Sequence, residues 1–369
     1  MRVQVVDPPA YTPPYDRSLC AALARAGADV ELVTSRFVHG SVPAPLGYEV
    51  RESFYRLSGR CDADAPGRRA LKLAEHVTDM LRYRRNGANV DVRHFQWLPA
   101  PALDSRLLPA GEPRVLTAHG VLRSEGWERR RRPLRRMLER MDAVVVLSEF
   151  GRERLAETGI DPARVRVIPH GAFDYLTRQP DEVPLPPELA DVTEPVILFF
   201  GLIRPYKGVD VLLDAFRSLT DAELWIVGRP LGLSLDDLRE RASRAPGRVR
   251  FVPRFVSDRE LPAYFRRADV VALPHRDAEQ SGVLFAALAF GKPIVMSDVG
   301  GFGEVAATGA GTLVAPGAPE ALAARLQELI DDPAQREQLA EAAAAAAAGP
   351  YSWEAVARQT LDLYRELTR

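Results

Sequence analysis

Short apolar runs alternate with amphipathic stretches along most of this 369-residue chain. The runs are rich in Val, Ile and Leu, and the stretches between them repeat apolar residues at a helical spacing. Strands that alternate with helices predict βαβ units, and therefore parallel sheets covered by helices. The predicted strands cover residues 3–7, 30–34, 92–97, 115–119, 143–147, 165–168, 195–200, 222–227, 249–252, 270–273 and 293–296.

A segment of different amino-acid composition divides this pattern into two series. Residues 176–194 carry four prolines and several acidic side chains, which is typical of a linker. A chain of this length also exceeds what one hydrophobic core usually supports. We therefore expect two doubly wound α/β domains of similar size, with ligands bound in the cleft at the carboxyl ends of their strands.

The bulk composition excludes several classes of protein. The formal net charge of −1 at pH 7 gives no field that would attract nucleic acid. Cys20 and Cys61 are the only cysteines, too few for a disulfide framework or a zinc site, and we expect no metal site. The N-terminal MRVQVVD predicts a strand rather than a signal peptide, and no run of about 18 apolar residues predicts a transmembrane helix. A cytoplasmic protein is expected.

The strongest candidate site is a strand-to-helix turn with the sequence FGLIRPYKGVD, which begins at Phe200. Gly201 lets a ligand approach the backbone, and Arg204 and Lys207 place two cations at the carboxyl edge of the sheet. Such cations can hold a diphosphate and stabilise it as it leaves. Lys207 is one of only three lysines in an arginine-rich chain, which favours a need for its compact ammonium group. Two solvated loop charges are the alternative interpretation.

A second turn, PHRDAEQSGV, follows the predicted strand 270–273. Ser281 and Gly282 stand where the next helix is predicted to begin, and free N–H groups at a helix N-terminus form an anion site. A simple helix cap is the alternative role for Ser281. Two turns suited to phosphate in one domain favour the functional interpretation of both.

Aromatic and polar residues end the strands of the first domain. His119 ends one predicted strand, HFQW ends another, and YTPPYD follows the first. Such side chains suit a sugar or another hydroxylated acceptor, although packing roles are the alternative. The candidate acceptor residues are Tyr11, Tyr15, Asp16, Gln96 and Trp97.

The sequence WERRRRPLRR from residue 127 is the one dense basic segment. Its arginines between Arg129 and Arg136 suit an anionic bilayer, so peripheral contact with the inner face of a membrane is one interpretation. A solvated helix face is the other.

Together these motifs resemble glycosyltransferase family 4, a large retaining family with the GT-B fold. The resemblance covers nearly the whole chain and rests on the Gly201–Lys207 turn, Val-Gly at 227, FVPRFVS at 251, and AFGKPIV at 289 followed by DVGG. It implies two Rossmann-like domains that face each other across a cleft. The implied divisions are an acceptor-binding domain 1–175, a linker 176–194, a donor-binding domain 195–348, and a C-terminal helix in 349–369 that crosses back.

The resemblance also implies residue roles. A nucleotide-diphosphate sugar would be held as co-substrate, its diphosphate by cations and N–H groups and its base beside the backbone at 255–256. The implied donor-binding residues are Gly201, Arg204, Lys207, Gly228, Arg254, Phe255, Val256, Ser281, Gly282 and Val283. The implied catalytic residues are His119, beside the transferred sugar, with Arg204, Lys207 and Glu279.

The chain departs from the family's pattern in the second turn. The family often carries two glutamates, one on the sugar and one on the ribose, and the matching positions here are Ala278 and Ala286. Glu279, one place along, is the candidate for the first role, and no residue supplies the second. A Gln-Ser-Gly-Val sequence from Gln280 stands in this loop, as in variants of the family.

We therefore expect a retaining hexosyltransferase that needs no metal or other cofactor and moves a sugar to a hydroxyl acceptor on a glycan, a glycolipid or a small molecule. Two alternatives stay open. A nucleotide-sugar epimerase of the same fold would convert the donor with no acceptor present. A non-catalytic sugar-nucleotide-binding protein would bind the donor without turnover.

Overall fold

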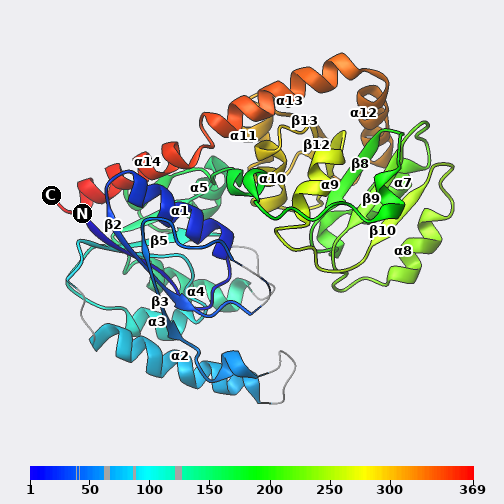
Figure 1. Ribbon diagram of the computed structural model, residues 1–369. Helices are drawn as coiled ribbons and strands as arrows, with labels where there is room; N and C mark the ends of the chain where they lie inside the picture. Colours follow the sequence, from blue (N-terminus) through cyan, green and yellow to red (C-terminus); the bar gives the residue numbers. More distant parts are fainter. Residues whose placement is uncertain (39, 41, 62–66, 86–88, 121–126) are drawn as a thin grey trace. The chain divides into compact units, whose positions relative to one another are not determined.

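The computed structural model describes residues 1–38, 40, 42–61, 67–85, 89–120 and 127–369, with the backbone alone for 127–131. The chain divides into two compact units, residues 1–171 with 353–369, and residues 172–352. Each unit is a parallel sheet with helices packed on it (Figure 1), which confirms the predicted α/β class with two doubly wound domains.

The described sheet of the first unit has the order β3-β2-β1-β4-β5-β6-β7, with every neighbouring pair parallel. The order reverses between β1 and β4, where a doubly wound sheet binds its ligands. Its strands are β1 (Arg2–Asp7), β2 (Asp29–Ser35), β3 (Glu49–Phe54), β4 (Val92–Phe95), β5 (Arg114–Ala118), β6 (Ala143–Val146) and β7 (Val165–Val167). Its helices are α1 (Pro13–Arg25), α2 (Arg68–Arg85), α3 (Pro101–Leu107), α4 (Trp127–Leu138), α5 (Glu149–Ala156) and α14 (Trp353–Leu367).

The last helix, α14, lies along α1 in the first unit (Figure 1). His94 of β4 ties it to the sheet, because its Nδ1 lies 2.6 Å from the Tyr364 hydroxyl and its Nε2 lies 2.7 Å from Oγ1 of Thr117. Burial lowers the pKa of His94 to about 3, so the imidazole is neutral and carries one N–H donor and one acceptor. Among the described residues, no helix is long and apolar enough to cross a lipid bilayer.

The described sheet of the second unit has the order β10-β9-β8-β11-β12-β13, again all parallel, and reverses between β8 and β11. Its strands are β8 (Val196–Phe200), β9 (Glu223–Val227), β10 (Val249–Val252), β11 (Val270–Leu273), β12 (Ile294–Ser297) and β13 (Gly311–Val314). Its helices are α6 (Pro187–Ala190), α7 (Val209–Phe216), α8 (Leu235–Ala242), α9 (Leu261–Arg267), α10 (Gly282–Ala289), α11 (Phe302–Ala306), α12 (Pro319–Asp331) and α13 (Pro333–Ala348).

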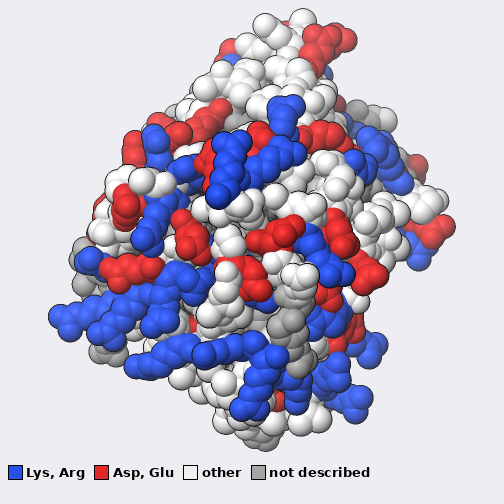
Figure 2. All heavy atoms as spheres, turned by 90° about the vertical axis from the view of Figure 1, so that its left-hand side faces the viewer, with Lys and Arg blue, Asp and Glu red and all other residues white. Residues whose placement is uncertain are grey.

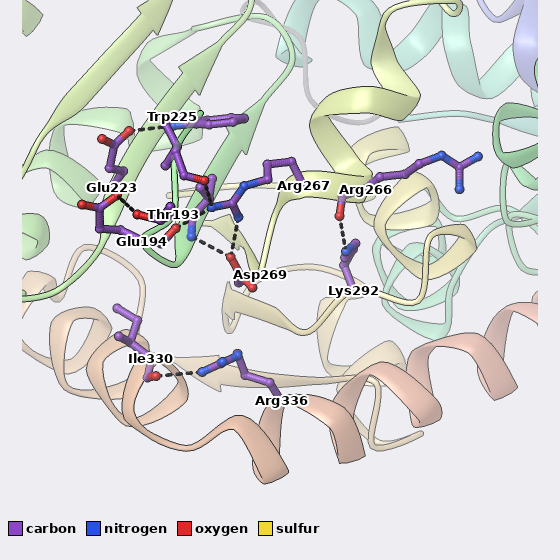
Figure 3. Close-up of polar contacts among 12 residues, drawn as sticks. Thr193, Glu194, Glu223, Trp225, Arg266, Arg267, Asp269, Lys292, Ile330 and Arg336 are labelled. Carbon is purple, nitrogen blue, oxygen red and sulfur yellow. Dashed lines mark hydrogen bonds and ion pairs between the residues drawn. The ribbon is translucent and has the colours of Figure 1, made fainter. Parts of the chain in front are cut away.

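The segment 176–194, expected as a linker, groups with the second unit and packs on it. The Arg267 guanidinium donates from Nη2 to the backbone oxygens of Val192 (2.8 Å) and Glu194 (2.6 Å), while its Nη1 donates to Asp269 (2.9 Å; Figure 3). These bonds fasten the end of the segment to the start of β11. Proline content predicted an irregular path here, but it could not show that arginines of α9 would hold that path in place.

Candidate functional site

Two strand-to-helix turns emerge from neighbouring strands at the carboxyl edge of the second sheet, because β8 and β11 pair in parallel. The first turn leads from Phe200 through a short 3₁₀ helix, Pro205–Lys207, into α7. The second leads from Leu273 into α10. The fold therefore brings the two sequence motifs together at the point where the strand order reverses, which is the position expected of a ligand site.

Glycines allow these turns to pack backbone against backbone. Gly208 has φ +67°, and a Cβ atom there would overlap the backbone oxygen of Pro274 in the second turn. Gly228, after β9, has φ +143°, and its Cβ would overlap the backbone oxygen of Gly201. No other residue fits these positions without moving the neighbouring backbone.

Lys207 and Arg204 give the first turn its positive charge. Both side chains are half-buried, and no carboxylate of the described residues pairs with either. Burial, and secondarily the charge of Arg204, lowers the pKa of the Lys207 ammonium to about 8. The Nε atom of Arg204 is buried with no hydrogen-bond partner in the described part of the chain. Lys292 differs, because its Nζ donates to the backbone oxygen of Arg266 at 2.9 Å (Figure 3).

The second turn ends at the N-terminus of α10. Ser281 precedes the helix and is buried, but its side chain makes no capping hydrogen bond. Gly282 is exposed and Val283 is half-buried. The first N–H groups of a helix have no partner within it, so this end of α10 has donors for an anion.

The loop before α10 is held against the segment after β12. Gly301 donates its N–H to the backbone oxygen of Glu279 (3.0 Å), and a Cβ at Gly300 would overlap the backbone oxygen of Ala278. Ala278 and Ala286 are both 3% exposed, whereas the Glu279 side chain is half-buried. Glu279 therefore remains partly accessible, and Asp277, two positions earlier in the loop, is exposed.

Arg254, Phe255 and Val256 follow β10. Arg254 pairs with Glu260 (Nη2 to Oε1, 2.6 Å) and donates from Nη1 to the backbone oxygen of Phe255 (3.0 Å). Val256 is buried, and Phe255 is 53% exposed. Arg254 thus orders its own loop, and Phe255 is the side chain that this segment presents at the surface.

In the first unit, His119 follows β5 and lies against Gln96 and Trp97, which follow β4. Nε2 of His119 lies 2.8 Å from Oε1 of Gln96, and the Trp97 ring stacks on the imidazole with centroids 5.3 Å apart. Trp97 Nε1 donates to Oγ1 of Thr12 (2.9 Å). Burial, then the nearby rings of His170 and His94, holds the pKa of His119 well below its usual value. His119 is therefore a neutral, oriented imidazole at neutral pH.

Tyr15 and Asp16 lie in the interior, with exposures of 3% and 2%. The Tyr15 ring packs edge-on against His119, with centroids 4.6 Å apart. Asp16 lies beside Asp7, and burial raises the pKa of Asp7 to about 6 and that of Asp16 well above its usual range. Tyr15 therefore supports His119 from the interior, and the Asp7–Asp16 pair supports the loop that follows β1.

Tyr11 is the exposed member of the acceptor candidates, at 53%, and its ring meets Trp97 edge-on with centroids 5.4 Å apart. Lys72 of α2 lies beside it, with Nζ 5.4 Å from the centroid of Tyr11 and 4.8 Å from that of Tyr55. The sequence motifs give Lys72 no role. Its rarity as a lysine was the one sequence signal that singled it out.

The predicted basic helix corresponds to α4, where the side chains of Arg129–Arg131 lie outside the described residues. Arg132, Arg135 and Arg136 are exposed, and Arg135 pairs with Glu139 (2.8 Å). Figure 2 shows lysine and arginine side chains gathered over the lower part of its view, the level of α2 in Figure 1. In the described part of the chain, no group of three or more His, Cys, Asp or Glu side chains is placed to hold a metal ion.

Known proteins resemble this chain in sequence and in structure. Residues 17–172 match a family model described as Glycosyltransferase Family 4, and residues 194–332 match one described as Glycosyl transferases group 1. The D-inositol 3-phosphate glycosyltransferase of Kineococcus radiotolerans is 30% identical to this chain over an alignment 395 residues long, gaps included. The alignment covers 95% of this chain and 89% of that protein.

Two solved structures extend the comparison. Sucrose-phosphate synthase from Thermosynechococcus elongatus has a TM-score of 0.78 at 22% identity, covering 100% of this chain and 99% of that one. Anabaena Alr3699/HepE in complex with UDP-glucose has a TM-score of 0.74 at 20% identity, covering 100% of both chains. The predicted GT-B fold is confirmed.

Proposed function

This chain belongs to glycosyltransferase family 4, and we propose that it transfers a sugar, with retained configuration and without a metal ion, from a nucleotide-diphosphate sugar to a hydroxyl acceptor. One observation carries the proposal. At Gly201 (φ +100°), the position of a Cβ atom lies 3.1 Å from Nζ of Lys207 and 3.2 Å from Cγ2 of Val283. The Lys207 ammonium of the first turn and Val283 at the N-terminus of α10 therefore both lie next to the backbone of Gly201.

The donor diphosphate is the anion that suits this convergence. Lys207 and Arg204 are cations without carboxylate partners among the described residues, and burying such charges is costly unless an anion compensates them. The same groups stabilise the diphosphate as it leaves, the task that a metal ion performs in other transferases. We assign the exposed Phe255 and the neighbouring Val256 backbone to the edge of the nucleobase.

The Gln-Ser-Gly-Val loop sets the details of donor recognition. Ala278 and Ala286 are buried and offer no carboxylate to the sugar or ribose, so Glu279 takes the sugar-binding role in this proposal. We place no second carboxylate for double displacement, and therefore propose attack from the face that the diphosphate leaves, with a phosphate oxygen accepting the hydroxyl proton. A stable glycosyl-enzyme adduct in a mass spectrum would contradict this route.

The first unit supplies the acceptor side of the proposal. We assign His119, which is neutral and fixed by Gln96 and Trp97, to the transferred sugar. We assign the aromatic surface of Tyr11 and Trp97 to the acceptor. The name of the Kineococcus relative, D-inositol 3-phosphate glycosyltransferase, includes a phosphorylated compound. Lys72, adjacent to Tyr11, is the cation that would meet a negatively charged acceptor here.

Nucleoside diphosphate release tests the donor site. The purified protein is incubated with UDP-, GDP- and ADP-sugars in the presence of EDTA, and release is measured for the wild type, Arg204→Ala and Lys207→Ala. We expect slow release from one donor, lost in both variants and retained in Arg241→Ala, a matched loss of a cation elsewhere in the unit. The absence of release together with the absence of any thermal shift from all three donors would contradict the proposal. Conversion of the donor sugar to its epimer would favour an epimerase.

We also propose that α4 makes peripheral contact with anionic lipid at the inner face of the membrane. Arg132, Arg135 and Arg136 are exposed on this helix, and basic side chains near an anionic surface gain about 1 kcal/mol each. Co-sedimentation with vesicles containing phosphatidylglycerol should fall when these three arginines become glutamine. Unchanged co-sedimentation would remove the membrane from the proposal.

A further inference from the structure

Arg276, in the second turn, makes several hydrogen bonds to the first turn and to the start of α7. Its guanidinium forms a fork on Asp210, with Nη1 to Oδ1 at 2.6 Å and Nη2 to Oδ2 at 2.7 Å. Its backbone N–H donates to the backbone oxygen of Tyr206 (2.7 Å), and Nη1 also reaches the backbone oxygen of Pro205 (3.2 Å). Every one of these partners belongs to the turn that carries Lys207 or to the first turn of α7.

We infer that Arg276 is a positioning residue, whose fork on Asp210 holds Arg204 and Lys207 in register with the N-terminus of α10. The inference rests on the proposed function, because it concerns how the donor diphosphate is gripped by both turns at once. A diphosphate bridges two anion sites only if their separation is fixed, and small misplacements of binding groups have large effects on bound complexes.

The charge balance separates this role from direct contact with the donor. Both terminal nitrogens of Arg276 are occupied by Asp210, so its positive charge is locally neutralised, unlike the charge of Lys207. Asp210 also lies in the first turn of α7, where a carboxylate interacts favourably with the helix dipole. The pair is therefore satisfied before any ligand arrives.

The pair is also partly exposed, with side-chain exposures of 44% and 32%. Exposed pairs add little to overall stability, so breaking this one should leave the unit folded. The effect of its loss should appear in the geometry of the donor turns. The pair between Arg266 and Glu182 is a matched control, because its side chains have similar exposures (50% and 29%) and it joins α9 to the segment 176–194 in the same unit, away from both turns.

A double-mutant cycle read by calorimetry tests the inference. UDP, GDP and ADP are titrated into the wild type to find the diphosphate that binds, and then into Arg276→Ala, Asp210→Ala and the double variant. Each single variant should bind that diphosphate about tenfold more weakly, and the double variant no more weakly than either. Arg276→Lys, which keeps the charge but loses the fork, should recover part of the affinity at an unchanged melting temperature. Arg266→Ala should bind as the wild type does.

Three results would overturn the inference. Wild-type affinity in Arg276→Ala would show that the fork does not position the turns. Additive losses in the double variant would show that Arg276 and Asp210 act independently, as they would if Arg276 contacted the donor itself. A wild type that binds none of the three diphosphates would overturn the donor site, and the positioning role with it. Asp210→Asn, which keeps the shape of the side chain, replaces Asp210→Ala if that variant unfolds.

Discussion

Donor binding should weaken at alkaline pH, because the ammonium group of Lys207 in the free protein has a pKa of about 8. Burial is the larger cause of this lowering, and the positive charge of Arg204 adds to it. A bound diphosphate would favour the charged amine and so raise its pKa. The donor should therefore bind the protonated form of Lys207, with an affinity that is nearly full at pH 7 and falls as pH rises through 8.

The size of the loss follows from the fraction of Lys207 that is protonated. That fraction falls from nearly all at pH 7 to about one tenth at pH 9, so affinity should fall about tenfold over this range if the bound form keeps its proton. Arg204→Ala removes one cause of the lowered pKa. In that variant the fall should begin at higher pH, on top of the weaker binding expected from the lost contact.

Calorimetric titration of the intact nucleotide-diphosphate sugar at a series of pH values measures this directly. Lys207→Arg is the decisive control, since a guanidinium stays charged throughout the range and should give a flat profile. If Lys207→Arg loses affinity above pH 8 as steeply as the wild type does, another group titrates and the reasoning is refuted. Uptake of a proton on binding at pH 9, seen as a dependence of the heat on the buffer, would support it.

The same lowered pKa means that charged Lys207 destabilises the ligand-free protein. Between about 8 and the ordinary value of 10.5, the folded state binds fewer protons than the unfolded state, so this contribution to stability improves as pH rises through that window. Lys207→Met should therefore melt about 2 °C higher than the wild type at pH 7 without donor. A lower melting temperature for this variant would contradict the argument that the buried charge of Lys207 destabilises the ligand-free protein.

Two further variants test the packing that surrounds the sites. Gly208→Ala should lower the free energy of unfolding by roughly 3 kcal/mol or more, because the added Cβ overlaps the Pro274 backbone and the positive φ has its own cost. Gly317→Ala is the control, since Gly317 has φ +73° with nothing within 4 Å of the added Cβ. It should lose only about 1 kcal/mol in the same urea titration. Equal losses would refute the overlap. Tyr364→Phe leaves the Nδ1 atom of buried His94 without its hydroxyl partner and should cost about 1–3 kcal/mol, seen as a lower denaturation midpoint; an unchanged midpoint would mean that this bond does not hold α14.

The fold was predictable wherever hydrophobic runs were buried on both faces. The central strands β1, β8 and β11 stand out as apolar runs, and their helices followed from the alternation. The edge strands β7 and β10 were predicted, but β3 and β13 were missed, because the polar EVRESF and the short GTLV, which begins with glycine, do not stand out as apolar runs. Local periodicity carries no signal for these two strands.

The candidate site was predictable only for residues with an unusual local signature. Lys207 was found because a lysine stands in a glycine-containing turn after a strand. The link between Arg276 and Asp210 could not be found in this way, since nothing in either segment indicates the other and the pair forms only because β8 and β11 are neighbours. Burial of Tyr15 was equally hidden, because a tyrosine after a strand has the same appearance in sequence whether its ring faces solvent or the core.

The donor turns of the second unit and the surroundings of His119 in the first unit are built from different kinds of contact, and this difference constrains how each can vary. The two donor turns meet through the backbone at Gly208, and the first turn meets the end of β9 through the backbone at Gly228, so even an added methyl group would force these segments apart. The surroundings of His119 are side chains, namely the stacked Trp97 and the hydrogen-bonded Gln96, which can be exchanged singly without moving the strands that carry them. Substitutions around His119, which would alter acceptor choice, should therefore be tolerated by the fold more readily than substitutions in the donor turns, which would alter diphosphate binding.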